Sequence, residues 1–346
     1  MNDITFEEVV TAYYDCRRNK RNTSQQLEFE FHLEKNLWKL YEELNQEIFI
    51  PEAHNFFIIT HPKPREVWCS NFRDRIVHHL IYNRTNYIES DYIDNTFACL
   101  RGKGTLRCAQ KVQKTMRSLW KDKDNYKFLH VDIANFFVSI DREIIKKQLY
   151  PKIENETTIK LIEIFLNQSP TENYYYTGDP KLKELIPDRK SLFGKSTGLT
   201  IGNLTSQIFA NHYLNEFDWY CKENISQYYF RYMDDLLFFI HKDQKIYQII
   251  DDINDYLATL NMTLNSSKTK HNKLEHGVNF VGYFIRPFCK YVRNSTKQRA
   301  KLATEWQSIN SYYGLMRQAN CYNLRKKIAI QNNINMIKYE KLNQLI

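Results

Sequence analysis

Residues 227–241, QYYFRYMDDLLFFIH, place two adjacent carboxylates, Asp234 and Asp235, between two runs of aromatic and branched apolar residues. Such runs favour β-strands and a polar pair between them favours a turn, so we expect a β-hairpin with the two carboxylates at its tip. Unpaired carboxylates on a tight turn repel each other, and they either stay in water or share a bound cation. Taken alone, a solvated turn is the commoner outcome. A third carboxylate close to the hairpin would favour the cation.

Residues 126–141, YKFLHVDIANFFVSID, supply a third carboxylate in Asp132. It interrupts a compact apolar strand, where a charge is costly unless it is paired or bound to a metal. A salt-bridged structural residue remains one interpretation, but together with the hairpin it predicts two strands that bring three carboxylates to one point. An all-oxygen ligand set suits Mg²⁺, and two such ions would support an in-line phosphoryl displacement. The strand is formed by Phe128, Leu129, Val131 and Ile133.

The composition predicts a globular protein with a basic C-terminal segment. Of 346 residues, 42% are hydrophobic, which is enough for a large core and for two or three subdomains. The net charge is +9, and residues 286–346 hold 12 Lys or Arg against only Glu305 and Glu340, so the excess positive charge lies there. Such a segment favours a polyanionic partner.

Seven cysteines are scattered along the chain without a C-x-x-C pair. An odd number without metal-ligand spacing predicts neither a disulfide framework nor a zinc ribbon, and it fits a reducing compartment. The amino terminus, MNDITFEEVV, lacks a basic region followed by an apolar core. No uninterrupted apolar run approaches the ~18 residues of a membrane span. We therefore expect a cytoplasmic protein that is neither secreted nor membrane-spanning.

The N-terminal part of the chain alternates between helical and strand patterns. Residues 24–48 have apolar residues close to helical spacing and predict one amphipathic helix. Residues 56–68 predict two strands interrupted by prolines. A hairpin there would present Lys63 and Arg65 near its tip.

Residues 72–90 return to helical spacing. His78 and His79 on this helix lack an i, i+4 ligand partner, so we expect them to pack or face solvent rather than bind metal. Residues 101–105, RGKGT, precede a helical run, but they lack P-loop spacing and a preceding strand, which disfavours an NTPase. Residues 168–197 are rich in turn residues and predict a loop or hairpin inserted between other elements.

With these segments in place, the chain resembles the reverse transcriptases, because five segments follow the order of that family's palm motifs. Asp132 with Phe136 and Phe137 is similar to motif A, and residues 232–235, YMDD, are similar to motif C. Between them, residues 198–214, GLTIGNLTSQIFANHYL, resemble motif B, a glycine turn that opens a helix. Five motifs in one order are very hard to obtain by chance. The other two motifs are residues 260–269, similar to motif D, and residues 279–284, similar to the primer-grip hairpin. In addition, residues 63–75 resemble the fingers motifs and residues 101–105 the segment ahead of motif A, so the resemblance covers about residues 50–325.

This resemblance implies an α+β right-hand polymerase with fingers, an antiparallel palm and a helical thumb. The activity it implies is RNA-directed DNA polymerisation. No segment is left for a ribonuclease H or endonuclease domain, so we expect RNA removal and integration to need other proteins. The implied division is an N-terminal helical extension over 1–50, fingers over 51–125, a palm over 126–285 with an insertion at about 168–197, and a basic helical thumb over 286–346.

The resemblance also implies the residues of a two-magnesium site. Asp132, Asp234 and Asp235 would bind two Mg²⁺, and the backbone carbonyl of Ile133 would help. Asp234 is expected to be the more direct ligand of the hairpin pair. Lys268, in motif D, would protonate the pyrophosphate leaving group as general acid, unless it is a solvated lysine after a turn.

Nucleotide recognition follows from the same resemblance. Lys63 and Arg65 would neutralise the incoming triphosphate. Phe137 would lie under the sugar and clash with a 2′-hydroxyl, which selects deoxynucleotides.

Motif B narrows the resemblance further. Most reverse transcriptases related to group II introns have glutamine directly before the glycine that opens the motif's helix, and Ser-Pro after it. Here these places hold Ile201 before Gly202, and Ser206 with Gln207. The pattern IGNLTSQ resembles the reverse transcriptases of diversity-generating retroelements, which copy a template RNA with frequent errors at adenines. We hypothesise that a branched alkyl group in place of the amide removes hydrogen bonds that position the nascent base pair, lowering fidelity.

The C-terminal segment resembles the thumb of this family. Apolar residues spaced alternately by four and three predict one helix stripe that packs into the core. Basic side chains around it would face outward and hold the template-primer backbone. The stripe consists of Leu302, Trp306, Ile309, Tyr313 and Met316, and the basic set consists of Lys297, Arg299, Lys301, Arg317, Arg325, Lys326 and Lys327.

The implied partners are a template RNA, a DNA or RNA primer, deoxynucleoside triphosphates and a small basic accessory variability protein. Two alternatives stay open. One is another prokaryotic reverse transcriptase, of phage-defence or group II intron-like type. The other is an RNA-binding protein of maturase type, which the three aspartates disfavour because a pure binder has no reason to place acids where RNA phosphates approach.

Overall fold

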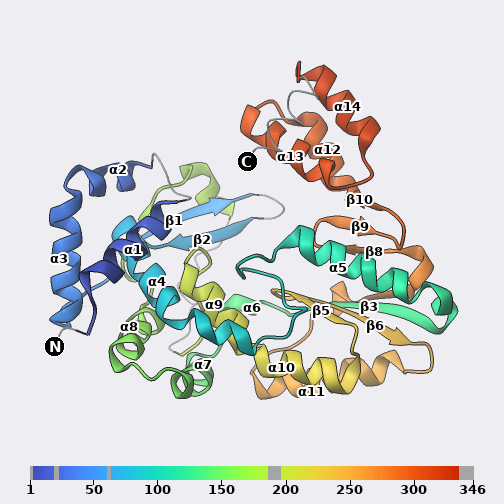
Figure 1. The fold of residues 1–346 in the computed structure, drawn as a ribbon, viewed down its shortest axis with the longest axis horizontal. Helices are drawn as coiled ribbons and strands as arrows, with labels where there is room; N and C mark the ends of the chain where they lie inside the picture. Colours follow the sequence, from blue (N-terminus) through green and yellow to red (C-terminus); the bar gives the residue numbers. More distant parts are fainter. Residues whose placement is uncertain (1–2, 19–22, 61–63, 186–195, 335–346) are drawn as a thin grey trace. The chain divides into compact units, whose positions relative to one another are not determined.

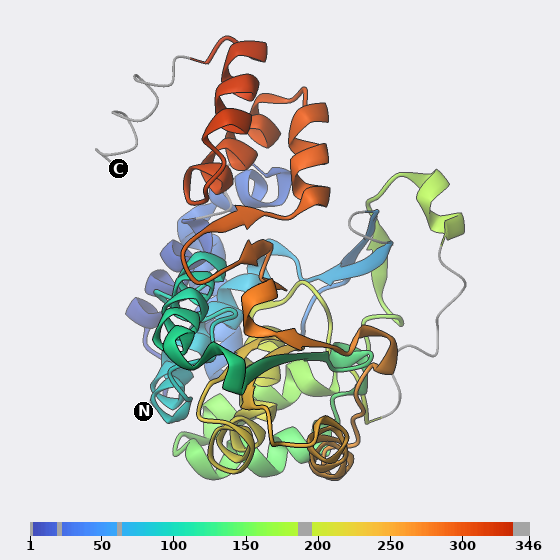
Figure 2. The same ribbon diagram turned by 90° about the vertical axis from the view of Figure 1, so that its right-hand side faces the viewer.

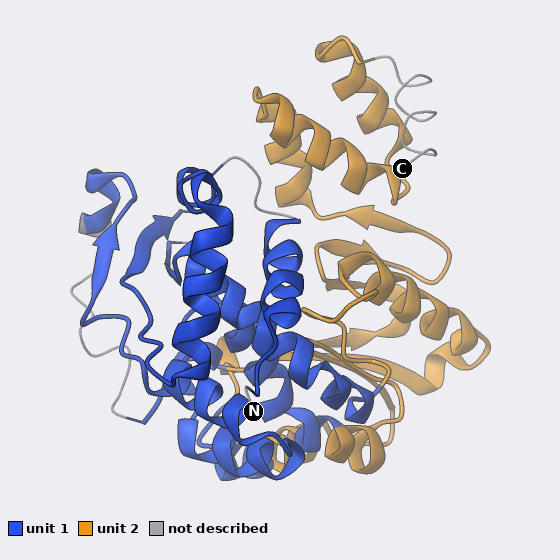
Figure 3. Cartoon of the chain, turned by 60° about the vertical axis from the view of Figure 1, so that its left-hand side comes forward, with its two compact units in different colours: residues 1–93, 134–218, 254–263 blue, residues 94–133, 219–253, 264–346 orange. Residues whose placement is uncertain are grey.

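The computed structural model describes residues 3–18, 23–60, 64–185 and 196–334. The chain forms two compact units, and each combines helices with β-sheet, as expected for an α+β fold (Figures 1 and 3). All seven cysteines lie in these ranges as free thiols. Among the described residues, no helix is both long and apolar enough to cross a membrane. Unit 1 consists of Met1–Ile93, Ala134–Asp218 and Asn254–Thr263, and unit 2 of Asp94–Ile133, Trp219–Ile253 and Leu264–Ile346.

The N-terminal helices of unit 1 differ from the single helix expected over residues 24–48. The chain instead forms α2 (Ser24–Phe31) and α3 (Leu33–Asn45), because His32 leaves the helical conformation at φ −126° and ψ 45°. Figure 1 shows the two helix axes at a sharp angle, so the apolar residues do not share one face. Four residues of the expected stripe are exposed, and three are buried. The exposed ones are Leu27, Phe31, Trp38 and Ile48, and the buried ones are Leu37, Leu40 and Leu44.

The sheet of unit 1 has the order β2-β1-β4. Strands β1 (His54–Ile59) and β2 (Arg65–Cys69) pair antiparallel, which confirms the hairpin expected from residues 56–68. Its tip, with Lys63, lies outside the described residues. Strand β4 (Tyr174–Tyr176) pairs parallel with β1, so the described part of the inserted segment adds a strand to the free edge of β1.

Helices make up the rest of unit 1. The helix expected over 72–90 ends earlier, at Thr85, and continues as a 3₁₀ segment. Two helices, α10 (Asn215–Tyr220) and α11 (Ile246–Thr259), run across the boundary of the two units. The other elements are α1 (Phe6–Arg17), α4 (Phe72–Thr85), η1 (Asn86–Asp91), α6 (Phe136–Ser139), α7 (Arg142–Leu149), η3 (Tyr150–Lys152), α8 (Glu156–Asn167), η4 (Pro180–Leu185) and α9 (Leu204–Tyr213).

Unit 2 is organised around a four-stranded antiparallel sheet in the order β5-β6-β3-β7. Strands β5 (Tyr229–Tyr232) and β6 (Asp235–His241) form the hairpin expected from residues 227–241. All of the residues from 236 to 240 on β6 are buried, as in a strand covered on both faces. Strand β3 (Tyr126–Asp132) pairs with β6 along its whole length, and β7 (Lys270–Lys273) pairs with its other edge.

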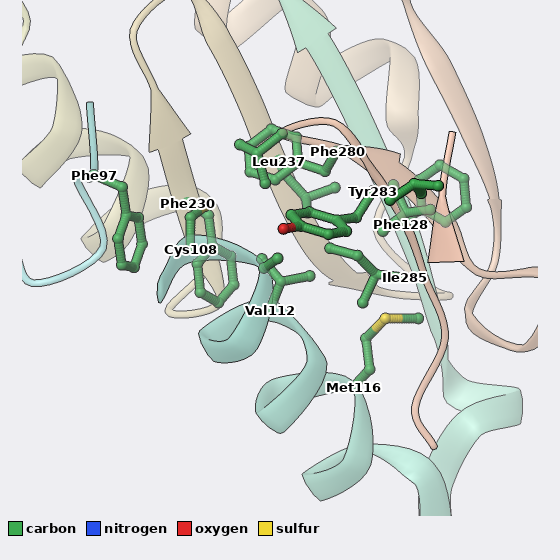
Figure 4. Close-up of a cluster of buried hydrophobic side chains, with 14 of the residues drawn as sticks. Phe97, Cys108, Val112, Met116, Phe128, Phe230, Leu237, Phe280, Tyr283 and Ile285 are labelled. Carbon is green, nitrogen blue, oxygen red and sulfur yellow. The ribbon is translucent and has the colours of Figure 1, made fainter. Parts of the chain in front are cut away.

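A second sheet of unit 2 is a meander of three short strands, β8 (Val278–Phe280), β9 (Tyr283–Ile285) and β10 (Lys290–Val292). Its first hairpin confirms the one expected at residues 279–284. Helix α5 (Thr105–Ser118) packs its apolar face on both sheets, as Figure 4 shows. The residues in contact there are Cys108, Val112 and Met116 from α5, Phe128, Phe230 and Leu237 from the first sheet, and Phe280, Tyr283 and Ile285 from the second.

The C-terminal helices follow β10 and form one bundle in unit 2 (Figure 2). The apolar stripe expected over residues 302–316 is wrong as a single face. Helix α12 (Asn294–Leu302) ends where the stripe should begin, and α13 (Trp306–Arg317) starts after a break, so Leu302 is 79% and Trp306 59% exposed. Only Ile309, Tyr313 and Met316 are buried. The remaining elements of unit 2 are α14 (Tyr322–Gln331), η2 (Trp120–Asn125), η5 (Cys221–Ile225), η6 (Ser266–Lys268) and η7 (Leu274–His276).

The first residue of β1 leads to a pH prediction. His54 is 1% exposed, and neither ring nitrogen has a hydrogen-bond partner in the described part of the chain. Burial lowers the pKa of His54 to about 4 from 6.5, so the unfolded chain binds a proton there that the folded chain does not. Above pH 6.5 His54 is neutral in both states and does not affect the free energy of unfolding. As the pH falls from 6.5 towards 4, protonation of the unfolded chain lowers that free energy. We expect His54→Phe to remove this loss, worth on the order of 3 kcal/mol at pH 4.

Thermal unfolding between pH 4 and 7.5 tests this expectation. The melting temperature of His54→Phe should exceed that of the parent by a margin that grows as the pH falls. The control is His271→Phe on the exposed strand β7, which should keep the parent's slope. Equal slopes for His54→Phe and the parent would contradict the prediction.

Candidate active site

Asp132, Asp234 and Asp235 lie at one end of the paired strands β3 and β6. Asp132 is the last residue of β3 and stands opposite Asp235, the first residue of β6. Asp234 occupies the turn of the hairpin, where Met233 has a left-handed φ of 58°. The backbone N–H of Ile133 donates to the carbonyl of Asp234 at 3.0 Å, which ties the hairpin tip to the end of β3. Backbone pairing alone therefore keeps the three aspartates together.

Lys268 contacts the buried aspartate of this group. Its ammonium donates to Asp132 Oδ1 at 2.5 Å, and the Asp132 side chain is only 7% exposed. Lys268 ends the 3₁₀ segment η6, whose preceding residue Asn265 donates its N–H to the Asp132 carbonyl at 2.7 Å. The segment that carries Lys268 is thus bound to the end of β3 through both main chain and side chain.

His130 is a site residue that the sequence reasoning missed. Its Nε2 lies 3.3 Å from Asp235 Oδ1, and its ring packs edge-on against Phe280 with centroids 5.5 Å apart. Burial acts to raise the pKa of Asp235, but the hydrogen bond from His130 and the charges of His130, Arg293 and Lys268 hold it below its usual value. The sequence did contain a signal for His130. It precedes Asp132 by two residues on a strand, so both side chains are expected on the same face of the sheet.

The environment of Asp234 shifts its pKa in the opposite direction to that of Asp235. Burial raises the pKa of its carboxyl to about 6, and the neighbouring charges of Asp132 and Asp235 add to the shift. The charge of Asp234 is therefore less favourable than that of Asp235. A cation bound beside it would relieve both causes.

The aspartates can be tested for their fit to Mg²⁺. Within the described ranges, no three His, Cys, Asp or Glu side chains form a group placed to hold a metal ion. Asp132 contacts Lys268, and Asp235 contacts His130. The donor chemistry nevertheless fits, because three carboxylates at one strand end offer only hard oxygen ligands. The raised pKa of Asp234 also marks a place where positive charge is favourable.

The residues expected to bind the nucleotide all belong to the segments of unit 1, and Lys63 among them lies outside the described residues. A loop between Gly198 and Asn203 connects them. Leu199 donates its N–H to the carbonyl of Phe137 at 2.8 Å, and the carbonyl of Ile201 accepts from the N–H of Trp68 on β2 at 2.9 Å. Arg65 is exposed at the start of the same strand, and Phe137, Ile201 and Gln207 are half-buried.

Gly202 has a conformation that only glycine adopts readily. Its φ is +136°, and a Cβ added there would lie 2.9 Å from the carbonyl oxygen of Trp68. The loop is therefore pressed against β2, and helix α9 starts directly after it. This matches the glycine turn expected to open a helix in residues 198–214.

The basic side chains of the C-terminal helices differ in exposure. Lys297 lies over the ring of Tyr291 at 5.7 Å, and Arg325 lies between Tyr313 and Tyr322, 5.7 Å from each ring centroid. These contacts hold two of the cations beside aromatic rings. Arg299, Lys301, Lys326 and Lys327 are exposed, while Lys297, Arg317 and Arg325 are half-buried.

Comparisons with known proteins found one family model and several solved structures that are similar to this chain. Residues 60–285, more than half of the chain, match the family model described as reverse transcriptase (RNA-dependent DNA polymerase). Among solved structures, the chain is similar to apo telomerase from Candida tropicalis truncated from its C-terminal domain, with 12% identity, a TM-score of 0.45, and coverage of 69% of this chain and 55% of that one. It is also similar to telomerase from Candida albicans in complex with the TWJ fragment of telomeric RNA, with 13% identity, a TM-score of 0.44, and coverage of 88% and 60%. The chain thus spans less than two thirds of the length of either telomerase chain.

Proposed function

Since the chain belongs to the reverse transcriptase (RNA-dependent DNA polymerase) family, we propose that it polymerises DNA on an RNA template. The observation that carries this proposal is that Asp132, Asp234 and Asp235 lie together at one end of the paired strands β3 and β6. These strands lie within the segment that matches the family. Its substrates would be deoxynucleoside triphosphates, a template RNA and a DNA or RNA primer.

The residues of unit 2 would divide the chemistry among them. Magnesium ions, when bound, would supply the charge that activates the attacking oxygen and stabilises the leaving one. Asp132, Asp234 and Asp235 would hold them, with the carbonyl of Ile133. Lys268, already within 2.5 Å of Asp132, would release it on metal binding and donate a proton to the leaving pyrophosphate.

The residues of unit 1 would select the nucleotide. Arg65, with Lys63, would neutralise the triphosphate, and Phe137 would exclude a 2′-hydroxyl. The loop that carries Ile201 and Gly202 would contact the nascent base pair. In this proposal residues 1–50 form an N-terminal extension, 51–125 the fingers, 126–285 the palm and 286–346 the thumb. The basic residues of the thumb would contact the nucleic-acid backbone.

We propose further that the enzyme acts in a diversity-generating retroelement. The motif B pattern IGNLTSQ supports this subclass, because Ile201 stands where related enzymes have glutamine. A structured template RNA and a small basic accessory variability protein would then be its partners.

Primer extension tests both levels of the proposal. The assay would use a DNA primer on an RNA template with Mg²⁺, would sequence the products, and would include an Asp234→Ala, Asp235→Ala double variant. Synthesis that the double variant lacks, with errors concentrated at template adenines, is the expected result. Accurate synthesis would keep the polymerase and reject the retroelement subclass. Absence of synthesis even with the accessory protein and native RNA would reject the polymerase and favour an RNA-binding role.

Fidelity gives a separate prediction for Ile201. An amide side chain restores the hydrogen bonds that a branched alkyl group lacks, so Ile201→Gln should lower misincorporation opposite adenine by about tenfold, the effect of roughly one well-placed hydrogen bond. Sequenced products of the parent and the variant on one template give the error rates. Ile201→Leu is the control, because it keeps the alkyl character and should leave the error spectrum unchanged. Identical spectra for parent and Ile201→Gln would refute the hypothesis.

A further inference from the structure

A buried histidine in unit 1 connects the fingers-type hairpin with motif B. His78, on α4, is 1% exposed. Its Nε2 lies 2.9 Å from Ser70 Oγ, and its Nδ1 lies 2.9 Å from Thr205 Oγ1 on α9. Burial, followed by the charges of His54, His79 and Arg75, lowers the pKa of His78 to about 3, so the ring is neutral and has one donor and one acceptor nitrogen. Both ring nitrogens are therefore used, each by a hydroxyl of a different segment.

Hydrogen bonds that do not involve His78 also join the residue after β2 to the loop before α9. The N–H of Ser70 donates to Asn203 Oδ1 at 2.9 Å, and Asn203 Nδ2 donates to Thr200 Oγ1 at 2.9 Å. Thr200 Oγ1 in turn lies 3.0 Å from Ser206 Oγ. Ser70, the residue after β2, is thus linked through His78 to Thr205 on α9, and through its own N–H to Asn203 and Thr200 in the loop over residues 198–203.

This loop is held by main-chain as well as side-chain hydrogen bonds, since the N–H groups of Gly198 and Leu199 donate to the carbonyls of Ile140 and Phe137 at 2.8 Å. It contains no helix or strand, and it has left-handed φ values of 92° at Gly198 and 136° at Gly202. The Ile201 carbonyl accepts from Trp68 two residues before Ser70, so a shift of Ser70 moves the point at which Ile201 is held.

We propose that His78 is a positioning residue that sets the placement of the loop over 198–203 and thereby the enzyme's affinity for the incoming nucleotide. This rests on the proposed function, in which the loop contacts the nascent base pair. His78 itself touches no substrate, and it acts through Ser70 and Thr205. Its removal should loosen the loop and weaken nucleotide binding while the aspartates of unit 2 keep their contacts.

The test compares four variants. His78→Asn and Thr205→Val each break the link between α4 and α9, and Thr205→Ser keeps the hydroxyl. His212→Asn is the matched control, because His212 is 3% exposed and bonded to the carbonyl of Gln148 at 3.2 Å, but has no hydrogen bond to the loop among the described residues. The readouts are hydrogen exchange of the amides in residues 199–203 and the KM and kcat for each nucleotide in primer extension.

We expect exchange in the loop to accelerate at least about tenfold in His78→Asn and Thr205→Val, with KM for the nucleotide raised about tenfold and kcat changed little. Thr205→Ser and His212→Asn should match the parent in both. Unchanged loop exchange in His78→Asn and Thr205→Val would overturn the inference whatever the activity, as would faster exchange with an unchanged KM, or the same change in His212→Asn. If the parent itself does not polymerise, the proposed function fails, and loop exchange alone then decides whether His78 holds the loop.

Discussion

Asp234→Asn is expected to lower the rate of RNA-templated DNA synthesis on the order of 10³-fold, the upper range for loss of one preorganised charged group at a reaction centre. Asparagine keeps the shape of the side chain but cannot neutralise a cation. The variant should fold, because the carboxyl it replaces is disfavoured as an anion, with a pKa raised to about 6 by burial and by Asp132 and Asp235. Single-turnover primer extension at saturating nucleotide and Mg²⁺ gives the rate.

The matched control for this prediction is Asp243→Asn. Asp243 follows the other end of β6 with its side chain 77% exposed, and the same substitution there should leave the rate within about twofold. The pH dependence of stability gives a second check. An aspartate with a raised pKa in the folded state binds its proton more tightly there than in the unfolded chain, so it costs stability as the pH rises from about 4 to 6. Asp234→Asn should therefore melt higher than the parent at pH 8 and lose this advantage below pH 4. Wild-type synthesis by Asp234→Asn would remove Asp234 from the active site.

Phe137→Ala is expected to lower the preference for deoxynucleotides over ribonucleotides on the order of 10²-fold, since a steric contact with one hydroxyl is lost. The ring is half-buried and packs at 5.4 Å against Phe136. The ratio of kcat/KM for dATP and ATP on one template measures the preference. The gain should come from better use of ATP rather than from poorer use of dATP.

Phe136→Ala is the control that distinguishes a loss of deoxynucleotide preference from a loss of folding stability. Phe136 is 3% exposed, so its truncation leaves a cavity and should lower the melting temperature, with an expected cost of about 3–5 kcal/mol. It should leave the nucleotide preference unchanged at a temperature where the variant is folded. An equal loss of preference in both variants would mean that general loosening of this segment, and not the Phe137 ring, controls selection.

The elements that carry the aspartates could be predicted from sequence because their signals are local. The runs on either side of Asp234 and Asp235 are long, apolar and separated by a polar turn, and such a pattern predicts a β-hairpin. The glycine turn before α9 was equally readable, since Gly202 has a backbone conformation that side chains resist. Motif order then gave the family.

The parts that were wrong or missed depend on contacts between distant segments. Periodicity in residues 24–48 and 302–316 continues through His32 and through the break between α12 and α13, because spacing does not reveal where an axis turns. The parallel pairing of β4 with β1 involves residues more than a hundred positions apart, which no turn chemistry announces. His130 and His78 looked ordinary because their partners, Asp235 and Thr205, lie far along the chain.

The pairing of β3 with β6 also bears on how the protein is made. Asp132 leaves the ribosome about a hundred residues before its strand partner Asp235, and the intervening segment Ala134–Asp218 belongs to unit 1. At ~5–20 residues per second, β3 waits roughly 5–20 s with an apolar edge unpaired. Strand pairs of such long separation form slowly and leave that edge open to other chains in the meantime. Recombinant yield should therefore respond to expression temperature and chaperone supply more than to substitutions at the surface.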